Sequence, residues 1–149
     1  MKTKMPSLNR KPITILLVED DPAHAEIVRR NLSEFPVAHR FVHVEDGQMA
    51  LDYLFGGNPG PPPALILLDL RLPKVDGLEV LRQIHEDEAL KAIPLVVLTT
   101  SAADSDLAAA YHLGATSYQL KPANFEGYTE LLAANLPQKE KLHRRPIHE

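Results

Sequence analysis

The feature that most constrains the fold of this chain is a set of short apolar runs with almost no polar residues in them. They cover residues 13–18, 64–68 and 93–98. A strand that is apolar along its whole length must be covered on both faces, which is typical of parallel sheets packed between helices. Two further strands are expected at residues 40–45 and 117–120. With 149 residues, enough for one domain, we expect a single α/β domain built on a five-stranded parallel sheet.

A helical pattern follows each of these strands. After Pro22, residues 24, 27, 28, 31, 32 and 35 form one helical face, and the helix should end near Pro36. Further helices are expected at 48–55, 75–84, 107–113 and 125–136, and the Gly- and Pro-rich segment 56–63 should be a surface loop. Alternating strands and helices predict a doubly wound sheet with helices on both faces.

Composition and charge exclude several classes of protein. The chain has no cysteine, so it can form neither disulfides nor a thiolate zinc site. No apolar run approaches the roughly 18 residues of a membrane span, and the N-terminus lacks a secretory signal. We therefore expect a cytoplasmic protein without a membrane partner. The net charge is −4 and most acidic groups lie in the body of the chain, which argues against nucleic-acid binding.

The two ends of the chain are basic. Residues 1–11 are expected to be a flexible basic leader, residues 12–136 the folded domain, and residues 137–149 a basic C-terminal tail. Leu142 and Ile147 stand between charged residues in this tail. The last helix and the tail could therefore dock onto a second copy, which makes a homodimer a hypothesis.

Polar side chains follow four of the five strands at their carboxyl ends. They are Glu19, Asp20 and Asp21 after the first strand, Asp69 after the third, Thr99 after the fourth and Lys121 after the fifth. Such strand ends meet at one edge of an open parallel sheet. Neighbouring carboxylates repel unless a cation lies between them, and oxygen ligands favour Mg²⁺. Asp21 could instead only cap the following helix.

Asp69 is the best candidate for a covalent nucleophile. It ends the most thoroughly apolar strand, where its direction would be fixed, and a carboxylate can attack a phosphorus atom. Phosphoryl transfer also needs preorganised donors for the charge on the equatorial oxygens. Lys121 and Thr99 would supply them. Each residue alone is a weak signal, and only their joint occurrence is specific.

These residues belong to motifs through which the chain resembles the receiver domain of two-component response regulators over residues 12–136. The matching motifs are Ile15-Leu16-Leu17-Val18-Glu19-Asp20-Asp21-Pro22, Leu68-Asp69-Leu70-Arg71-Leu72-Pro73-Lys74-Val75-Asp76-Gly77, Leu98-Thr99-Thr100-Ser101, Gly114-Ala115 and Lys121-Pro122. The spacing also matches, because Thr99 and Lys121 follow Asp69 by 30 and 52 residues, and the aromatic Tyr118 precedes Lys121 by three.

This resemblance implies a flavodoxin-like strand order, 2-1-3-4-5, and a phosphorylatable switch. A sensor histidine kinase would transfer a phosphoryl group to Asp69. The Mg²⁺ ligands would be Glu19, Asp20, Asp69 and the backbone carbonyl of Arg71. Lys121 and Thr99 would hold the phosphoryl oxygens. Thr99 and Tyr118 would then move and change the surface that partners bind.

A narrower resemblance is to single-domain receivers associated with bacterial phytochromes. The Pro/Gly insertion before the third strand and the run Lys121-Pro122-Ala123-Asn124-Phe125 with Tyr128 carry it. It implies that the kinase is a bacteriophytochrome. Position 71, two after the phosphoacceptor, holds Arg rather than a carboxylate that could act as a base, so slow self-dephosphorylation is expected.

Two competing interpretations remain at this stage. One is a Mg²⁺-dependent phosphohydrolase that forms an aspartyl-phosphate, but such enzymes need a second Asp where Arg71 stands. The other is a receiver-like domain with only a structural role, and the intact Asp69 and Lys121 argue against it. We expect a switch that acts by binding, with at most weak catalysis of its own phosphorylation.

Overall fold

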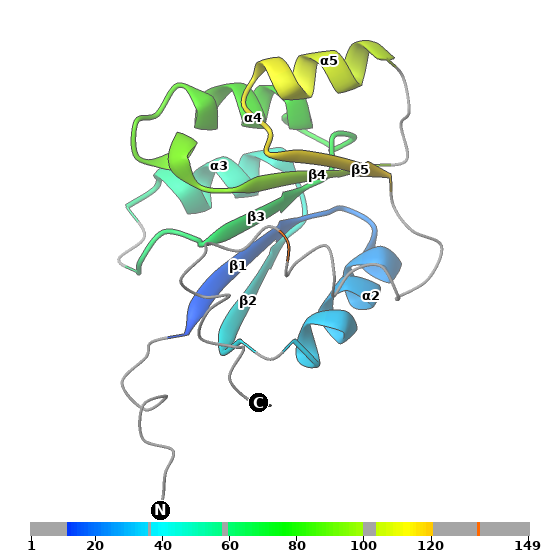
Figure 1. The fold of residues 1–149 in the computed structure, drawn as a ribbon, viewed down its shortest axis with the longest axis vertical. Helices are drawn as coiled ribbons and strands as arrows, with labels where there is room; N and C mark the ends of the chain where they lie inside the picture. The colour runs from blue at the N-terminus through cyan, green and yellow to red at the C-terminus, as the bar shows by residue number, and fades with distance from the viewer. Residues whose placement is uncertain (1–11, 36, 58–59, 100–103, 121–133, 135–149) are drawn as a thin grey trace, which may run out of the picture.

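A computed structural model describes residues 12–35, 37–57, 60–99, 104–120 and 134 (Figure 1). Five parallel strands form one sheet in the order β2-β1-β3-β4-β5. The strands are β1 (Ile13–Val18), β2 (His39–Val44), β3 (Leu65–Leu68), β4 (Leu95–Thr99) and β5 (Ser117–Leu120). Both the fold class and the strand order confirm the expectations from the sequence.

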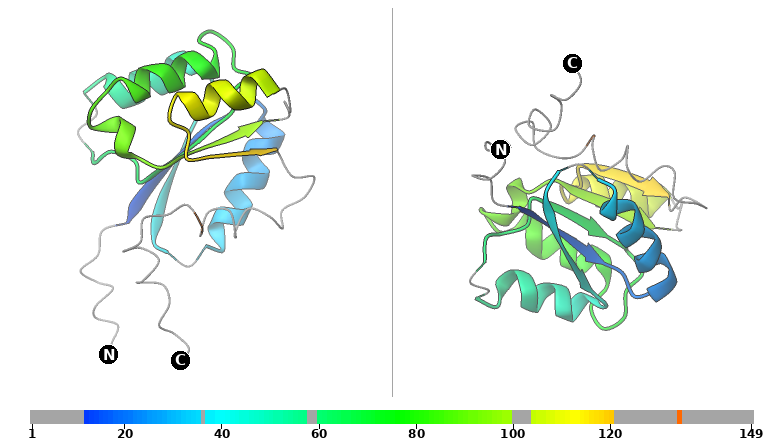
Figure 2. Two further views of the ribbon diagram at one scale, coloured as in Figure 1. Left: turned by 45° about the horizontal axis from the view of Figure 1, so that its top comes forward. Right: turned by 90° about the horizontal axis from the view of Figure 1, so that it is seen from below.

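Helices cover both faces of the sheet (Figure 2). They are α2 (Pro22–Ser33), α3 (Gly47–Phe55), α4 (Gly77–His85), α5 (Asp104–His112) and the short 3₁₀ helix η1 (Leu90–Ala92). Of these, α2 packs on one face, whereas α3, α4 and α5 pack on the other. The doubly wound arrangement is therefore confirmed. The expected leader, tail and final helix at 125–136 lie outside the described residues, apart from residue 134.

The central strand β3 separates two apolar cores. Leu65 and Leu67 face the core that includes Val28 of α2. Ile66 and Leu68 face the core that includes Val80 of α4. All four β3 side chains are fully buried, which explains why this strand carries no polar residue. Burial on both faces fixes the direction in which the next residue, Asp69, leaves the sheet.

Local hydrogen bonds place some boundaries differently from the sequence prediction. The helix α2 ends at Ser33 rather than near Pro36, because the N–H groups of Glu34 and Phe35 close a tighter last turn on Asn31 and Leu32. Thr99 lies in β4, opposite Leu120 of β5, and not after the strand. The expected strand 93–98 begins only at Leu95.

Two helices begin at residues other than those predicted. The expected helix 75–84 begins at Gly77 because the side chain of Asp76 accepts a hydrogen bond from the N–H of Leu78. The expected helix 107–113 begins three residues earlier, at Asp104, in a polar turn that apolar periodicity does not reveal. None of the described helices combines the length and the apolar character that a membrane span requires.

Candidate functional site

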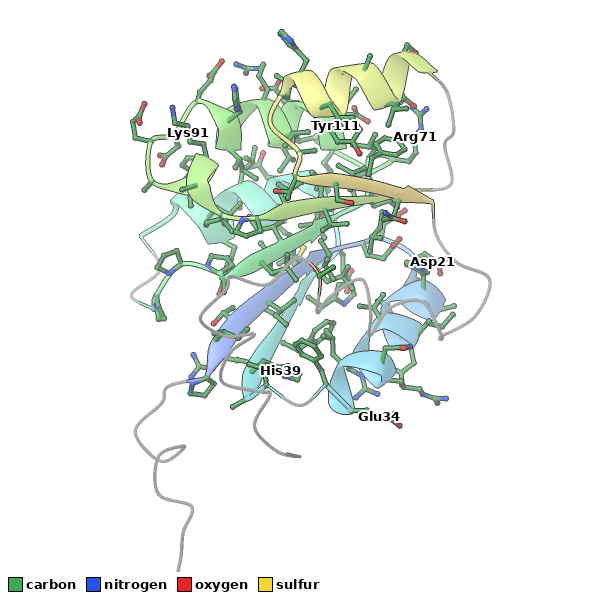
Figure 3. All side chains as sticks on the ribbon, viewed as in Figure 1. Asp21, Glu34, His39, Arg71, Lys91 and Tyr111 are labelled. Carbon is green, nitrogen blue, oxygen red and sulfur yellow. The ribbon has the colours of Figure 1, made fainter. Side chains whose placement is uncertain are left out.

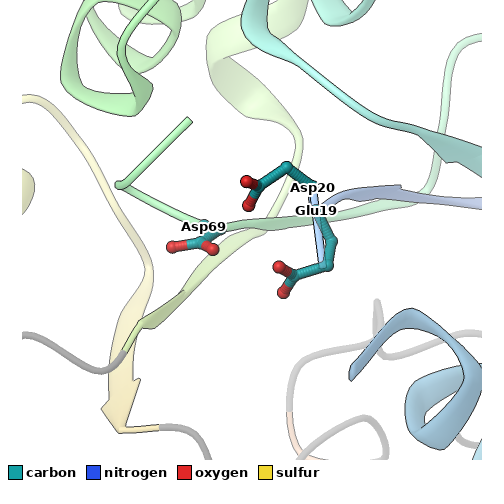
Figure 4. A group of neighbouring side chains, drawn as sticks. All are labelled: Glu19, Asp20 and Asp69. Atoms are coloured by element: carbon teal, nitrogen blue, oxygen red, sulfur yellow. The ribbon is translucent and has the colours of Figure 1, made fainter. Parts of the chain in front are cut away.

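Three carboxylates meet at the carboxyl ends of β1 and β3 (Figure 4). Ligand oxygens of Glu19, Asp20 and Asp69 all lie within 4.8 Å of one another. The two strands are neighbours in register, with Val18 opposite Leu68, so the residues that follow them emerge side by side. Glu19 and Asp69 are buried and Asp20 is exposed, which leaves the group open to solvent on one side.

Glu19 is held inside the domain by several donors. Its Oε2 accepts a hydrogen bond from the N–H of Asp21 at 3.0 Å, and its Oε1 lies 2.7 Å from Nδ1 of His24. The Nε2 of His43 lies 2.8 Å from the Glu19 carbonyl oxygen. The sequence analysis placed residue 24 on one face of a helix but did not pair it with Glu19. The only sequence signal was a His five residues after Glu19 on the inner face of a helix.

Asp69 is fixed by its backbone and by a close approach of α4. Its N–H donates to the Val18 carbonyl at 3.0 Å, and its Oδ1 accepts from the N–H of Arg71 at 3.0 Å. A Cβ atom on Gly77 would lie 2.5 Å from the Asp69 carbonyl oxygen, so only glycine permits this packing. The β3 strand and the start of α4 thus hold a buried carboxylate in one place.

Asp21 has a different role from its two neighbours. Its Oδ1 accepts a hydrogen bond from the N–H of Ala23 at 2.9 Å, which makes it the N-cap of α2. It does not belong to the group of three carboxylates. The alternative left open by the sequence, cap or ligand, is therefore decided in favour of the cap.

The remaining predicted residues are only partly described. The backbone of Thr99 lies at the end of β4, beside β3, and its side chain is outside the described atoms, as is Lys121. Tyr118 on β5 is half-buried, and its ring centroid lies 6.4 Å from that of Tyr111 on α5. The structure thus brings Asp69 together with Glu19 and Asp20.

Sequence reasoning also missed a contact of Arg71. The Nη2 atom of this residue lies 2.6 Å from Oδ2 of Asp106, which belongs to α5. Because 35 residues separate the two, no local pattern could have indicated the pair.

The donor set suits a hard divalent cation. Carboxylate oxygens are the ligands that Mg²⁺ and Mn²⁺ prefer, and three of them at one point carry negative charge that a cation would neutralise. Glu19 accepts hydrogen bonds at both oxygens, yet each oxygen has two lone pairs, so these contacts are compatible with ligation.

Comparison with known proteins decides the family. The sequence profile described as the response regulator receiver domain matches residues 15–133. The chain belongs to the response regulator receiver domain family. Receiver domains of this family are generally phosphoacceptor switches, and they bind Mg²⁺ or Mn²⁺ at the acidic site.

Two curated relatives resemble this receiver domain closely. The "Probable methanogenesis regulatory protein FilR2" of Methanothrix harundinacea is 50% identical over 117 residues, which cover 77% of this chain and 76% of FilR2. The response regulator Rcp1 of Synechocystis is 42% identical over 118 residues, which cover 77% of this chain and 80% of Rcp1.

Solved structures support the narrower relationship. Phosphorylated RcpA, a cyanobacterial phytochrome response regulator, is 40% identical with a TM-score of 0.75, covering 82% of this chain and 89% of RcpA. The Mn²⁺-bound form of Rcp1 has the same TM-score at 36% identity, covering 92% and 98%. The bacteriophytochrome response regulator AtBRR is 39% identical with a TM-score of 0.71, covering 85% and 94%. This receiver domain is thus homologous to phytochrome-associated response regulators.

Proposed function

We propose that Asp69 accepts a phosphoryl group from a sensor histidine kinase and that the modified domain changes its binding surface. The arrangement of Asp69 carries the proposal: a buried carboxylate, held by the N–H of Arg71, lies beside the carboxylates of Glu19 and Asp20. In the transfer, an oxygen of Asp69 forms a bond to phosphorus, the bond between phosphorus and the kinase histidine breaks, and the histidine nitrogen keeps that electron pair.

The same group of carboxylates supports the proposed cation site. Glu19, Asp20 and Asp69, with the backbone carbonyl of Arg71, would hold Mg²⁺, which supplies positive charge where negative charge develops. Lys121 and Thr99 would donate to the phosphoryl oxygens, and Tyr118 would respond to the movement of Thr99. These roles are supported by their sequence positions and by the placement of Thr99 beside β3.

Acetyl phosphate tests the phosphoacceptor directly. The native chain, incubated with acetyl phosphate and Mg²⁺, should gain the mass of one phosphoryl group in intact mass spectrometry, and the Asp69→Asn variant should gain none. Asp52→Asn is a matched control, because Asp52 is an exposed carboxylate on α3, away from the site. Modification of the Asp69→Asn variant to the native extent would overturn the proposal.

The kinase partner is proposed to be a bacteriophytochrome. The homology to Rcp1, RcpA and AtBRR supports this assignment. An autophosphorylated bacteriophytochrome kinase should phosphorylate the chain faster than a histidine kinase with an unrelated sensor. Equal rates would contradict the assignment. We further propose that the domain is a cytoplasmic switch that acts by binding its partners. It should not hydrolyse phosphate esters as a phosphohydrolase would, and it should not bind nucleic acid.

A homodimer through the last helix and the tail 137–149 is the remaining proposal. Two features support it. The tail carries the apolar residues Leu142 and Ile147, and its basic charge is opposite in sign to the acidic body of a second copy. Light scattering at high concentration, with and without acetyl phosphate, should give twice the mass of one chain. The mass of a single chain under both conditions would contradict it.

A further inference from the structure

Arg71 contacts both the phosphoacceptor and helix α5. Its N–H donates to Oδ1 of Asp69 at 3.0 Å, and its guanidinium Nη2 lies 2.6 Å from Oδ2 of Asp106. Asp106 is mostly buried, with 14% of its side chain exposed, whereas 60% of the Arg71 side chain is exposed. Figure 3 shows Arg71 beside the end of α5 at which the helix begins. One residue therefore connects the site to α5.

Modification of Asp69 would add a second anion near Arg71, whose backbone N–H already donates to Asp69. A phosphoryl group adds about −1.5 to −2 charges and several acceptor oxygens. Arginine pairs with phosphate and with carboxylate through the same planar set of donors, so contacts to the two anions compete. The backbone of Arg71 is already hydrogen-bonded to Asp69, and the exposed part of its long side chain has room to reorient.

We propose that Asp106 and phosphorylated Asp69 compete for the guanidinium of Arg71, which makes Asp106 a positioning residue for the phosphoryl site. In the unmodified domain Asp106 holds the guanidinium and ties the loop after β3 to α5. Modification of Asp69 draws the guanidinium away, and α5 loses this contact. Because coupling is reciprocal, whatever strengthens the contact with Asp106 opposes modification of Asp69. This inference depends on the proposed role of Asp69 as phosphoacceptor.

Trifluoroberyllate binding tests the competition at equilibrium. On a carboxylate this group has the tetrahedral shape and the charge of a phosphoryl group. Its affinity, measured by calorimetry in constant excess Mg²⁺, should rise about fivefold in Asp106→Asn, the effect of one charged hydrogen bond at a partly exposed site. Asp106→Glu should restore native affinity. In an Arg71→Gln background, Asp106→Asn should change nothing, because the guanidinium is gone.

A second variant separates competition from a general charge effect. Asp104→Asn removes the same charge from the first turn of α5 and should leave the affinity at the native value. Equal affinities of the native chain and Asp106→Asn would overturn the competition, and so would an equal gain in Asp104→Asn or in the Arg71→Gln background. If the competition fails while acetyl phosphate still modifies Asp69, the phosphoacceptor role stands. If acetyl phosphate leaves the native chain unmodified, both proposals fail.

Discussion

Nδ1 of His24 lies 2.7 Å from Oε1 of Glu19, and both side chains are almost completely buried. The imidazole therefore supports a carboxylate that the fold removes from water at the edge of the site. A buried acceptor that loses its hydrogen-bond partner destabilises the folded state, because it has given up its contacts with water and gains no other contact in return.

His24→Leu should therefore destabilise the domain, because Leu fills the space and leaves Oε1 of Glu19 without this donor. The loss in the free energy of unfolding should be about 1–3 kcal/mol. Urea denaturation without divalent cations measures it. His39→Leu is the control, since His39 is only half-buried and contacts the nearby Val37 carbonyl. An equal loss in both variants would show that the contact between His24 and Glu19 adds nothing to the free energy of unfolding.

Asp20 and Asp21 should differ in their effect on cation binding. Asp20→Asn removes one carboxylate of the group and should weaken Mn²⁺ binding by at least about tenfold. Loss of a residue that only orients a metal ligand already lowers metal affinity by about that factor. Asp21→Asn should bind Mn²⁺ with native affinity, because Asn caps helices as well as Asp does. Calorimetric titration with Mn²⁺ distinguishes the two. Similar losses in both variants would place Asp21 among the ligands.

Phosphorylated Asp69 should lose its phosphoryl group slowly. Arg71 stands where a carboxylate base could activate water, and its guanidinium cannot accept a proton. After rapid removal of acetyl phosphate, intact mass spectrometry should show the modified chain persisting for minutes. Release within seconds would contradict this expectation.

Lys74 should be replaceable by glycine with a gain in stability. Its backbone has φ = 70°, in the left-handed region that costs side-chain-bearing residues about 1–2 kcal/mol. Glycine removes that cost but makes the unfolded chain more flexible, which offsets about 0.4–1 kcal/mol. Lys74→Gly should therefore stabilise the domain by about 0.5–1 kcal/mol in urea denaturation. Lys74→Ala keeps the backbone cost and should give no gain. A gain as large in Lys74→Ala would point to the side chain instead.

Glu79 on α4 should titrate well below its ordinary range. Hydrogen bonds from Arg82 and then Gln83 lower the pKa of Glu79 from 4.5 to about 2. Because the folded-state pKa is lowered, the ion pair stabilises the helix above pH 4.5 and is lost as the pH falls towards 2. NMR titration of the carboxylate in Arg82→Gln should show a raised pKa. Arg29→Gln should instead raise the pKa of Glu26 and leave that of Glu79 unchanged. An unchanged Glu79 pKa in Arg82→Gln would refute the pairing.

The architecture and three of the site carboxylates could be predicted from the sequence. Uninterrupted apolar runs such as Leu65–Leu68 require cover on both faces, and alternating strands and helices supply it. Parallel strands end at one edge, so Asp69 had to emerge near the residues after Val18. These are short-range patterns combined with a general rule of chain topology, and they need no knowledge of individual contacts.

Other features were decided only by the tertiary structure. The pairs of His24 with Glu19 and of Arg71 with Asp106 depend on how helices pack and how side chains turn. The sequence left open whether Asp21 caps a helix or joins the site, and the hydrogen bond from the N–H of Ala23 makes it the cap of α2. Periodicity records which residues are apolar, whereas a contact between distant polar groups arises from the positions of whole elements, which no local pattern encodes.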